Sequence, residues 1–136
     1  MDLNKALNIS AAGMDAQTMR LRVIAENLAN QDTTGSSPGA DAYRRKTITF
    51  ENRVDASTDT PTVQVKRIAQ EKAAAQPLRY DPSNPAANAA GYVKTPNVNS
   101  FIEVMDMREA ERSYSANLSV LQATRSMLNR TIDMLK

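Results

Sequence analysis

Apolar residues recur at every seventh position through the last part of the chain. The row consists of Met107, Tyr114, Leu121, Leu128 and Leu135. A seven-residue repeat keeps its members on one side of an α-helix, as in coiled coils. Neither Gly nor Pro occurs from Ser100 to the last residue. The pattern therefore predicts one helix over residues 100–136, far longer than the mean globular helix of about 11–12 residues.

A second apolar row accompanies the first, and the two together predict a seam that needs a partner helix. Its members lie three residues before members of the first row and are Val104, Leu118 and Ile132. Glu111 and Arg125 interrupt this second row. Polar residues at seam positions can fix the register between helices. They can also lie at the edge of the seam with their charged ends in water, and the spacing leaves both interpretations open.

The residues Ser100-Phe101-Ile102-Glu103 match a capping box at the start of this helix. In that arrangement the Ser100 hydroxyl accepts a hydrogen bond from the backbone N–H of Glu103, and the Glu103 side chain reaches back to the backbone of Ser100. We therefore expect the helix to begin at Ser100.

The same seven-residue spacing appears at the N-terminal end. One row is Leu7, Met14, Leu21 and Leu28, and the row beside it holds Leu3 and Ile24. The pattern predicts a partner helix within residues 1–32 that ends among the polar residues after Asn27. A further stripe widens the apolar face, so more than one neighbour is expected. This stripe is Ile9, Ala12, Ala16, Met19 and Val23.

Gly13 lies inside the N-terminal helical pattern. A glycine in a helix interior costs about 1 kcal/mol relative to alanine. Two interpretations carry equal weight: a weak spot or kink in the helix, and a close approach of another backbone.

The middle of the chain, residues 33–99, has the pattern of strands and loops. Tyr43–Phe50 and Thr62–Ile68 alternate like strands, and residues 55–61 have the composition of a turn, so we expect a β-hairpin. Two strands alone are marginal, so the hairpin should lie against the helices or add a third strand from Leu78–Tyr80. Residues 81–97 hold several prolines and predict an extended arm.

These elements define the predicted fold class as mainly α. Long N- and C-terminal helices form a coiled-coil-like hairpin, with a small β-hairpin insertion and an extended arm between them. The expected domains are residues 1–32 and 100–136 for the two helices, and residues 33–99 for the loop, β insertion and arm.

Composition excludes most catalytic chemistry. The chain of 136 residues has no Cys and no His, which removes thiolates, the usual transition-metal ligands and the commonest general base near neutral pH. Only four glycines occur and no glycine-rich phosphate loop is present. The carboxylates near the start of the C-terminal helix are expected to be solvated; they are Glu103, Asp106, Glu109 and Glu111. We expect no enzyme activity, no metal and no cofactor.

Charge and hydropathy limit the partners. The net charge is +2, and each predicted helix is balanced. The run Arg44-Arg45-Lys46 between Tyr43 and Phe50 has two interpretations, a strand that binds nucleic acid and an exposed strand edge guarded by charge. The second is favoured because no basic field surrounds the run, so no nucleic-acid partner is expected. No stretch approaches the roughly 18 apolar residues of a membrane span. Because polar residues interrupt the hydrophobicity after Met1–Lys5, we expect no Sec-type signal peptide.

Five stretches together resemble the proximal rod proteins of the bacterial flagellar basal body, within the rod and hook axial protein family. They are residues 9–17, 23–35, 43–46, 114–135, and the segment 80–85 with 91–93 and 96–98. The last stretch and the short chain are most similar to the C-type group of these proteins. One departure concerns Ala42, since the family often has Pro directly before the Tyr-Arg-Arg-Lys run.

The resemblance implies a structural subunit of the proximal rod that transmits torque from the membrane ring to the hook. It also implies export through the flagellar type III apparatus without a cleaved signal peptide, and helical assembly in the periplasm. The implied partners are copies of itself, other rod proteins, the junction of the MS ring with the export gate, and the distal rod, with no direct membrane insertion. A freestanding helical-hairpin interaction module is the alternative.

In such an assembly the helical rows become the subunit interface. The expected interface residues are Leu7, Met14, Leu21, Ile24, Leu28, Met107, Tyr114, Leu118, Leu121, Leu128, Ile132 and Leu135.

Overall fold

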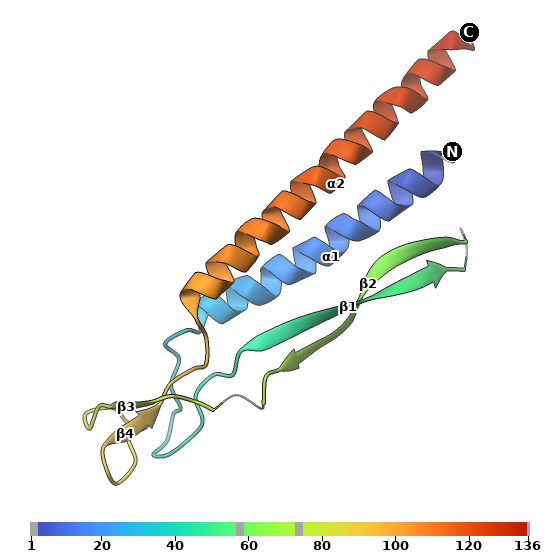
Figure 1. The fold of residues 1–136 in the computed structure, drawn as a ribbon. Coiled ribbons are helices and arrows are strands. Elements are labelled where there is room, and N and C mark those ends of the chain that lie inside the picture. Colours follow the sequence, from blue (N-terminus) through green and yellow to red (C-terminus); the bar gives the residue numbers. More distant parts are fainter. Residues whose placement is uncertain (1–2, 57–58, 73–74, 136) are drawn as a thin grey trace. The chain divides into compact units, whose positions relative to one another are not determined.

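The computed structural model describes residues 3–56, 59–72 and 75–135 (Figure 1). The elements in chain order are α1 (Leu3–Ala29), β1 (Lys46–Asp55), β2 (Thr60–Gln70), β3 (Leu78–Tyr80), β4 (Tyr92–Lys94) and α2 (Ser100–Met134). The predicted fold class is confirmed, because two long helices pack together and small antiparallel β-hairpins lie between them in the sequence. The helices have 27 and 35 residues.

The chain divides into two compact units, and each contains part of both helices. Unit 1 comprises Met1–Leu21, Ile48–Arg67 and Met107–Lys136. Unit 2 comprises Arg22–Thr47 and Ile68–Asp106. The polar contacts described below lie within unit 2, and the helix contact at Gly13 lies within unit 1.

The face of α2 that packs on α1 differs by one residue from the predicted seam. In the predicted main row, Met107, Tyr114, Leu121 and Leu128 are half-buried, as expected, whereas Leu135, just beyond the end of α2, is exposed. The second buried row, however, contains Glu103, Ala110 and Thr124, which are 0%, 0% and 7% exposed. The predicted members of that row stay exposed: Val104 at 42%, Leu118 at 37% and Ile132 at 47%. The second row was therefore wrong for the hairpin, because small and polar residues, rather than branched apolar ones, occupy the closest part of the contact.

Glu111 and Arg125 are also exposed in the single chain. They belong to the same outer row as Leu118, so they do not set the register of α1 against α2. A role between subunits stays a hypothesis.

Gly13 permits close contact between α1 and α2 in unit 1. A Cβ atom at Gly13 would lie only 2.8 Å from Nδ2 of Asn117. Asn117 is seven residues after Ala110 and belongs to the buried row of α2. The close approach is real, although the approaching group is a side chain and not another backbone.

Replacing Gly13 with alanine should therefore change the free energy of unfolding little by itself. The gain in helix propensity, about 1 kcal/mol, is opposed by displacement of the Asn117 side chain. In an Asn117→Ala background the same replacement should stabilise the chain by the full amount, measured by urea denaturation. An equal gain in both backgrounds would show that the contact carries no energetic cost.

The β1–β2 pair begins later and runs further than the sequence pattern indicates. Tyr43 precedes β1 because its N–H donates to the carbonyl of Thr33 (3.0 Å) instead of joining the ladder. Most of the hairpin lies in unit 1 together with residues 1–21 of α1, and Val63 and Val65 line a groove with Ala12 and Met19. The N-terminal helix thus has the hairpin as a neighbour besides α2, as expected.

β3 does not extend the β1–β2 pair. It forms a separate antiparallel sheet with β4, in the register Leu78↔Lys94, Arg79↔Val93 and Tyr80↔Tyr92. The predicted extended arm is thus partly wrong: residues 81–91 form turns that connect β3 to β4. Val93 is fully buried and holds this small sheet in unit 2.

The backbone N–H of Ala42 donates a hydrogen bond that a proline at this position could not make. Its backbone N donates to Oε1 of Gln76 (3.3 Å), and Nε2 of Gln76 donates to the Ala42 carbonyl (2.8 Å). The departure from the family's proline is therefore accommodated by a paired amide contact within unit 2.

Candidate assembly site

The start of α2 is capped by Asn99 and not by Ser100. Oδ1 of Asn99 accepts hydrogen bonds from the backbone N–H groups of Phe101 (3.0 Å) and Ile102 (3.4 Å). The Ser100 hydroxyl donates to Gln31, beyond the end of α1. The predicted capping box was wrong, because an asparagine one residue earlier satisfies the free N–H groups. The Glu103 side chain is thereby left for a tertiary role.

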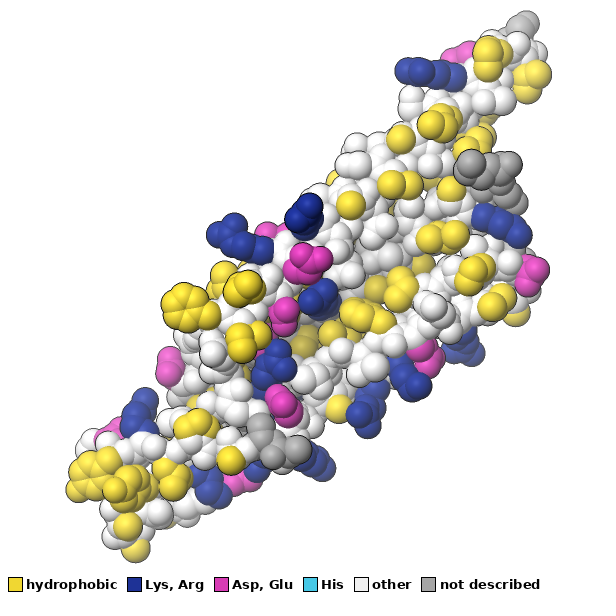
Figure 2. All heavy atoms as spheres, in the orientation of Figure 1, with side chains coloured by type: hydrophobic (Ala, Val, Ile, Leu, Met, Phe, Trp, Pro, Cys, Tyr) yellow, Lys and Arg dark blue, Asp and Glu magenta, His cyan; other side chains and the backbone are white. Residues whose placement is uncertain are grey.

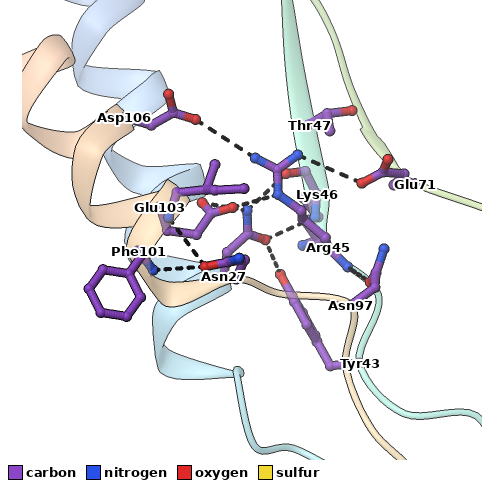
Figure 3. Close-up of polar contacts among 12 residues, drawn as sticks. Asn27, Tyr43, Arg45, Lys46, Thr47, Glu71, Asn97, Phe101, Glu103 and Asp106 are labelled. Carbon is purple, nitrogen blue, oxygen red and sulfur yellow. Dashed lines mark hydrogen bonds and ion pairs between the residues drawn. The ribbon is translucent and has the colours of Figure 1, made fainter. Parts of the chain in front are cut away.

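Glu103 is a fully buried carboxylate at the contact between the helices (Figure 3). Its Oε1 accepts from Nε of Arg45 at 2.5 Å, and its Oε2 accepts from Nδ2 of Asn27 at 3.1 Å. The expectation that Glu103 is solvated was wrong. A buried charge of this kind persists only when it is paired and hydrogen-bonded, and both partners come from distant parts of the sequence.

Asn27 uses the whole hydrogen-bonding capacity of its amide. Oδ1 accepts from the Tyr43 hydroxyl and from the Lys46 backbone N–H, both at 2.9 Å. Nδ2 donates to the Lys46 carbonyl at 2.9 Å as well as to Glu103. The side chain pairs with both backbone groups of Lys46 as a neighbouring strand would. Asn27 therefore attaches the first residue of β1 to α1.

Arg45 brings the β segment to the same point. Its guanidinium lies 3.7 Å from a carboxylate oxygen of Glu71 and 3.8 Å from one of Asp106, besides the contact with Glu103. Burial lowers the pKa of Arg45, but the hydrogen bond and charge of Glu103, followed by the charges of Glu71 and Asp106, outweigh this and leave that pKa raised. The Arg45 backbone N–H donates to Oδ1 of Asn97 (2.9 Å).

We call Asn27, Tyr43, Arg45 and Glu103 the junction network. It joins α1, the segment before β1, and α2 within unit 2. Sequence reasoning missed it, although Asn27 and the Tyr43–Lys46 run lie in stretches that carry the family resemblance. The sequence shows only that Glu103 lies seven residues before Ala110, and the burial of both residues becomes visible in the fold.

The three cations of the Arg44–Lys46 run are each paired with a carboxylate. Arg44 lies 3.1 Å from Asp41, Arg45 contacts Glu103, and Lys46 contacts Glu26. The interpretation of an exposed, charge-guarded strand edge was wrong, because the side chains of Arg44, Arg45 and Lys46 are only 25%, 22% and 29% exposed. Because all three cations of this run are paired, the run does not present a cluster of unpaired cations to the phosphates of a nucleic acid.

Ionisation of Tyr43 should make the free energy of unfolding fall in alkaline solution. Burial and the carboxylates of Glu26 and Glu103 raise the pKa of Tyr43 to about 12, whereas the unfolded phenol has a pKa near 10. The folded chain thus holds this proton to higher pH, so the associated stability is fully present below about pH 10 and is lost as the pH rises toward 12. Tyr43→Phe should lose stability less steeply between pH 9 and 12 in urea denaturation. Parallel curves for the two proteins would contradict the assignment.

The predicted interface residues occupy three different environments in the single chain. Ile24 is buried at 4% exposure. Leu118, Ile132 and Leu135 are exposed, the last at 83%. The others are half-buried: Leu7, Met14, Leu21, Leu28, Met107, Tyr114, Leu121 and Leu128. Figure 2 shows hydrophobic side chains at the surface along α2.

Metal-ligating groups and membrane-spanning helices are both absent among the described residues. No group of three or more carboxylates or other ligating side chains there is placed to hold a metal ion. No helix within the same residues is both long and apolar enough to cross a membrane. The described structure is thus a helical hairpin with exposed apolar rows on α2 and a polar junction whose charges are paired, an architecture of the structural helical-hairpin class.

Comparison with known proteins identifies the family. Residues 89–134 match the family described as flagellar basal body rod FlgEFG protein C-terminal. The flagellar basal-body rod protein FlgC of Agrobacterium fabrum is 48% identical over 98% of this chain and 96% of its own length. That of Salmonella typhimurium strain LT2 is 39% identical over 98% of both chains, and that of Aquifex aeolicus is 38% identical over 100% and 99%. The chain belongs to the FlgC family of flagellar basal-body rod proteins and is a structural, non-enzymatic rod subunit.

Proposed function

We propose that the chain is a subunit of the proximal rod whose α1 and α2 form the inner tube of the assembly. The observation that carries the proposal is the outer row of α2, where Val104, Leu118 and Ile132 remain exposed in the single chain. Burial of apolar surface is favourable by about 25 cal/mol per Å², so these rows favour association with further helices. Heterologous contacts that do not close produce a helical assembly.

The twelve predicted interface residues have roles at two levels in this proposal. The eight half-buried residues and the exposed Leu118, Ile132 and Leu135 are covered by neighbouring subunits, and Ile24 supports the hairpin on which they lie. The neighbours are copies of the chain, other rod proteins, the distal rod, and the junction of the MS ring with the export gate. Long helices packed side by side transmit torque from the ring to the hook because they resist bending and twisting together.

The proposal includes export by the flagellar type III apparatus without a cleaved signal peptide, followed by assembly in the periplasm. This route is what the resemblance to flagellar rod proteins implies. A chain without cysteine also needs no disulfide to fold in an oxidising compartment.

Deletion of the gene in its host, followed by electron microscopy of purified basal bodies, tests the proposal. Basal bodies should lack the rod and hook, and the cells should be non-motile. Expression of the wild-type chain from a plasmid should restore all three. Intact rods and hooks in the deletion strain would contradict the proposed function.

A further inference from the structure

Unit 1 contains a groove between α1 and β2 that the single chain leaves unfilled. Its volume is about 280 Å³. The lining is formed by Ala12, Asp15, Ala16, Met19 and the strand residues 63–65. An apolar cavity of about 150 Å³ can hold a benzene ring, whereas small-molecule sites usually measure about 300–1,000 Å³. The groove therefore suits one or two large apolar side chains better than a cofactor.

The outer face of α2 presents side chains of this kind. Phe101 is 85% exposed and Met105 is 71% exposed. Positions four and seven residues after Phe101 share its side of a helix, so Met105 and the exposed Arg108 follow Phe101 along one stripe. We call these three residues the Phe101 stripe. It combines an apolar end with a basic end.

The groove and the stripe match in spacing and in charge. Met19 and Ala12 are seven residues apart, as are Phe101 and Arg108. In an antiparallel alignment Phe101 lies beside Met19, Met105 lies over Asp15 and the small side chain of Ala16, and Arg108 lies beside Ala12, one helical turn from Asp15. A thioether beside an aromatic ring is a favourable contact. Within the described residues neither Asp15 nor Arg108 has an ion-pair partner.

We propose that the groove of one subunit receives the Phe101 stripe of a second copy of the same chain. The contact joins two different surfaces and is therefore heterologous, which is the kind of contact that produces an open helical array. This inference rests on the proposed rod function and specifies one interface within it. It also identifies the partner as a copy of the chain, because both complementary surfaces belong to this sequence.

Cysteine cross-linking in assembled rods tests the contact, because the chain has no native cysteine. Cells that lack the wild-type gene would express two single-cysteine chains together, Ala16→Cys and Met105→Cys. Mild oxidation of purified basal bodies should give a cross-linked dimer of about twice the chain mass. The matched control pairs Ala16→Cys with Val104→Cys. Val104 is the residue before Met105, but its side chain lies on another side of the helix. This pair should cross-link at least about tenfold less, since a disulfide requires Cα atoms about 4.4–6.8 Å apart.

Motility and the amount of each chain in the basal bodies separate this inference from the proposed function. If both cysteine chains are incorporated and no dimer forms, or if the Val104→Cys control forms it equally, the inference is wrong while the rod assignment stands. Failure of the wild-type chain to restore rods would instead contradict the rod assignment.

A charge exchange provides an independent test that does not depend on the cysteine variants. Asp15→Arg and Arg108→Asp should each reduce incorporation into rods by about threefold, within the range of an exposed ion pair. The double variant should restore incorporation to near the wild-type amount. If incorporation of the double variant falls by the product of the two single reductions, Asp15 and Arg108 do not contact each other in the rod, and the inference is overturned.

Discussion

Replacing Arg45 with methionine should lower the free energy of unfolding by about 3–5 kcal/mol, the cost of leaving one partner of a buried ion pair alone. Glu103 is fully buried, and Arg45 is the cation in direct contact with it. Without Arg45, the carboxylate retains only the hydrogen bond from Asn27. Methionine preserves much of the apolar length of the side chain, so the loss reports on charge more than on packing. Urea denaturation followed by circular dichroism measures the change.

Two further variants define the expected pattern. Arg44→Met removes a neighbouring cation whose partner, Asp41, is largely exposed, and should cost less than about 1 kcal/mol. The double variant Arg45→Met with Glu103→Leu should be more stable than Arg45→Met alone, because it removes the isolated charge as well as the pair. Equal losses for Arg45→Met and Arg44→Met would show that the junction network does not hold the fold together.

Leu118→Asp should prevent incorporation of the chain into rods while leaving the isolated subunit almost unchanged. Leu118 lies in the outer row of α2 and is 37% exposed. An aspartate at this position reaches water in the single chain, so the free energy of unfolding should fall by less than about 1 kcal/mol. If a neighbouring helix covers the row in the rod, the same carboxylate becomes buried without a partner, which costs several kcal/mol.

Mass spectrometry of purified basal bodies measures incorporation, and circular dichroism measures the stability of the isolated subunit. Ser119→Asp is the matched control, because Ser119 is the next residue, is exposed, and lies on another side of the helix. It should be incorporated normally. Leu118→Asp chains present in rods at the wild-type amount would refute the assignment of this row to the subunit interface.

The long elements follow from the sequence because their cause is local and periodic. A heptad repeat without Gly or Pro predicts a helix wherever it occurs, and both α1 and α2 begin and end close to the expected residues. The absence of Cys and His excluded the commonest catalytic groups directly. The family resemblance, carried by stretches along nearly the whole chain, indicated a rod subunit before any contact was known.

The phase of the helix contact was decided only by the tertiary structure. A two-row pattern defines a helix face to within about one residue, and α2 has apolar residues on both sides of its main row. The sequence pattern favoured Val104 and Leu118 for the contact with α1, because their side chains are branched and apolar. The folded chain instead places Ala110 and Asn117 there, where small and polar groups allow the helices to approach at Gly13.

The junction network was beyond sequence reasoning for a physical reason. Glu103 at the start of a helix has the same local pattern whether it caps that helix, is solvated, or is buried. Its burial depends on Arg45 and Asn27, which lie 58 and 76 residues away in the chain. Local periodicity determined that two long helices form, and the resemblance of several stretches to rod proteins indicated what class of protein they build. Only the tertiary structure decided which polar residues are satisfied inside the fold, and hence which apolar rows remain exposed in the single chain.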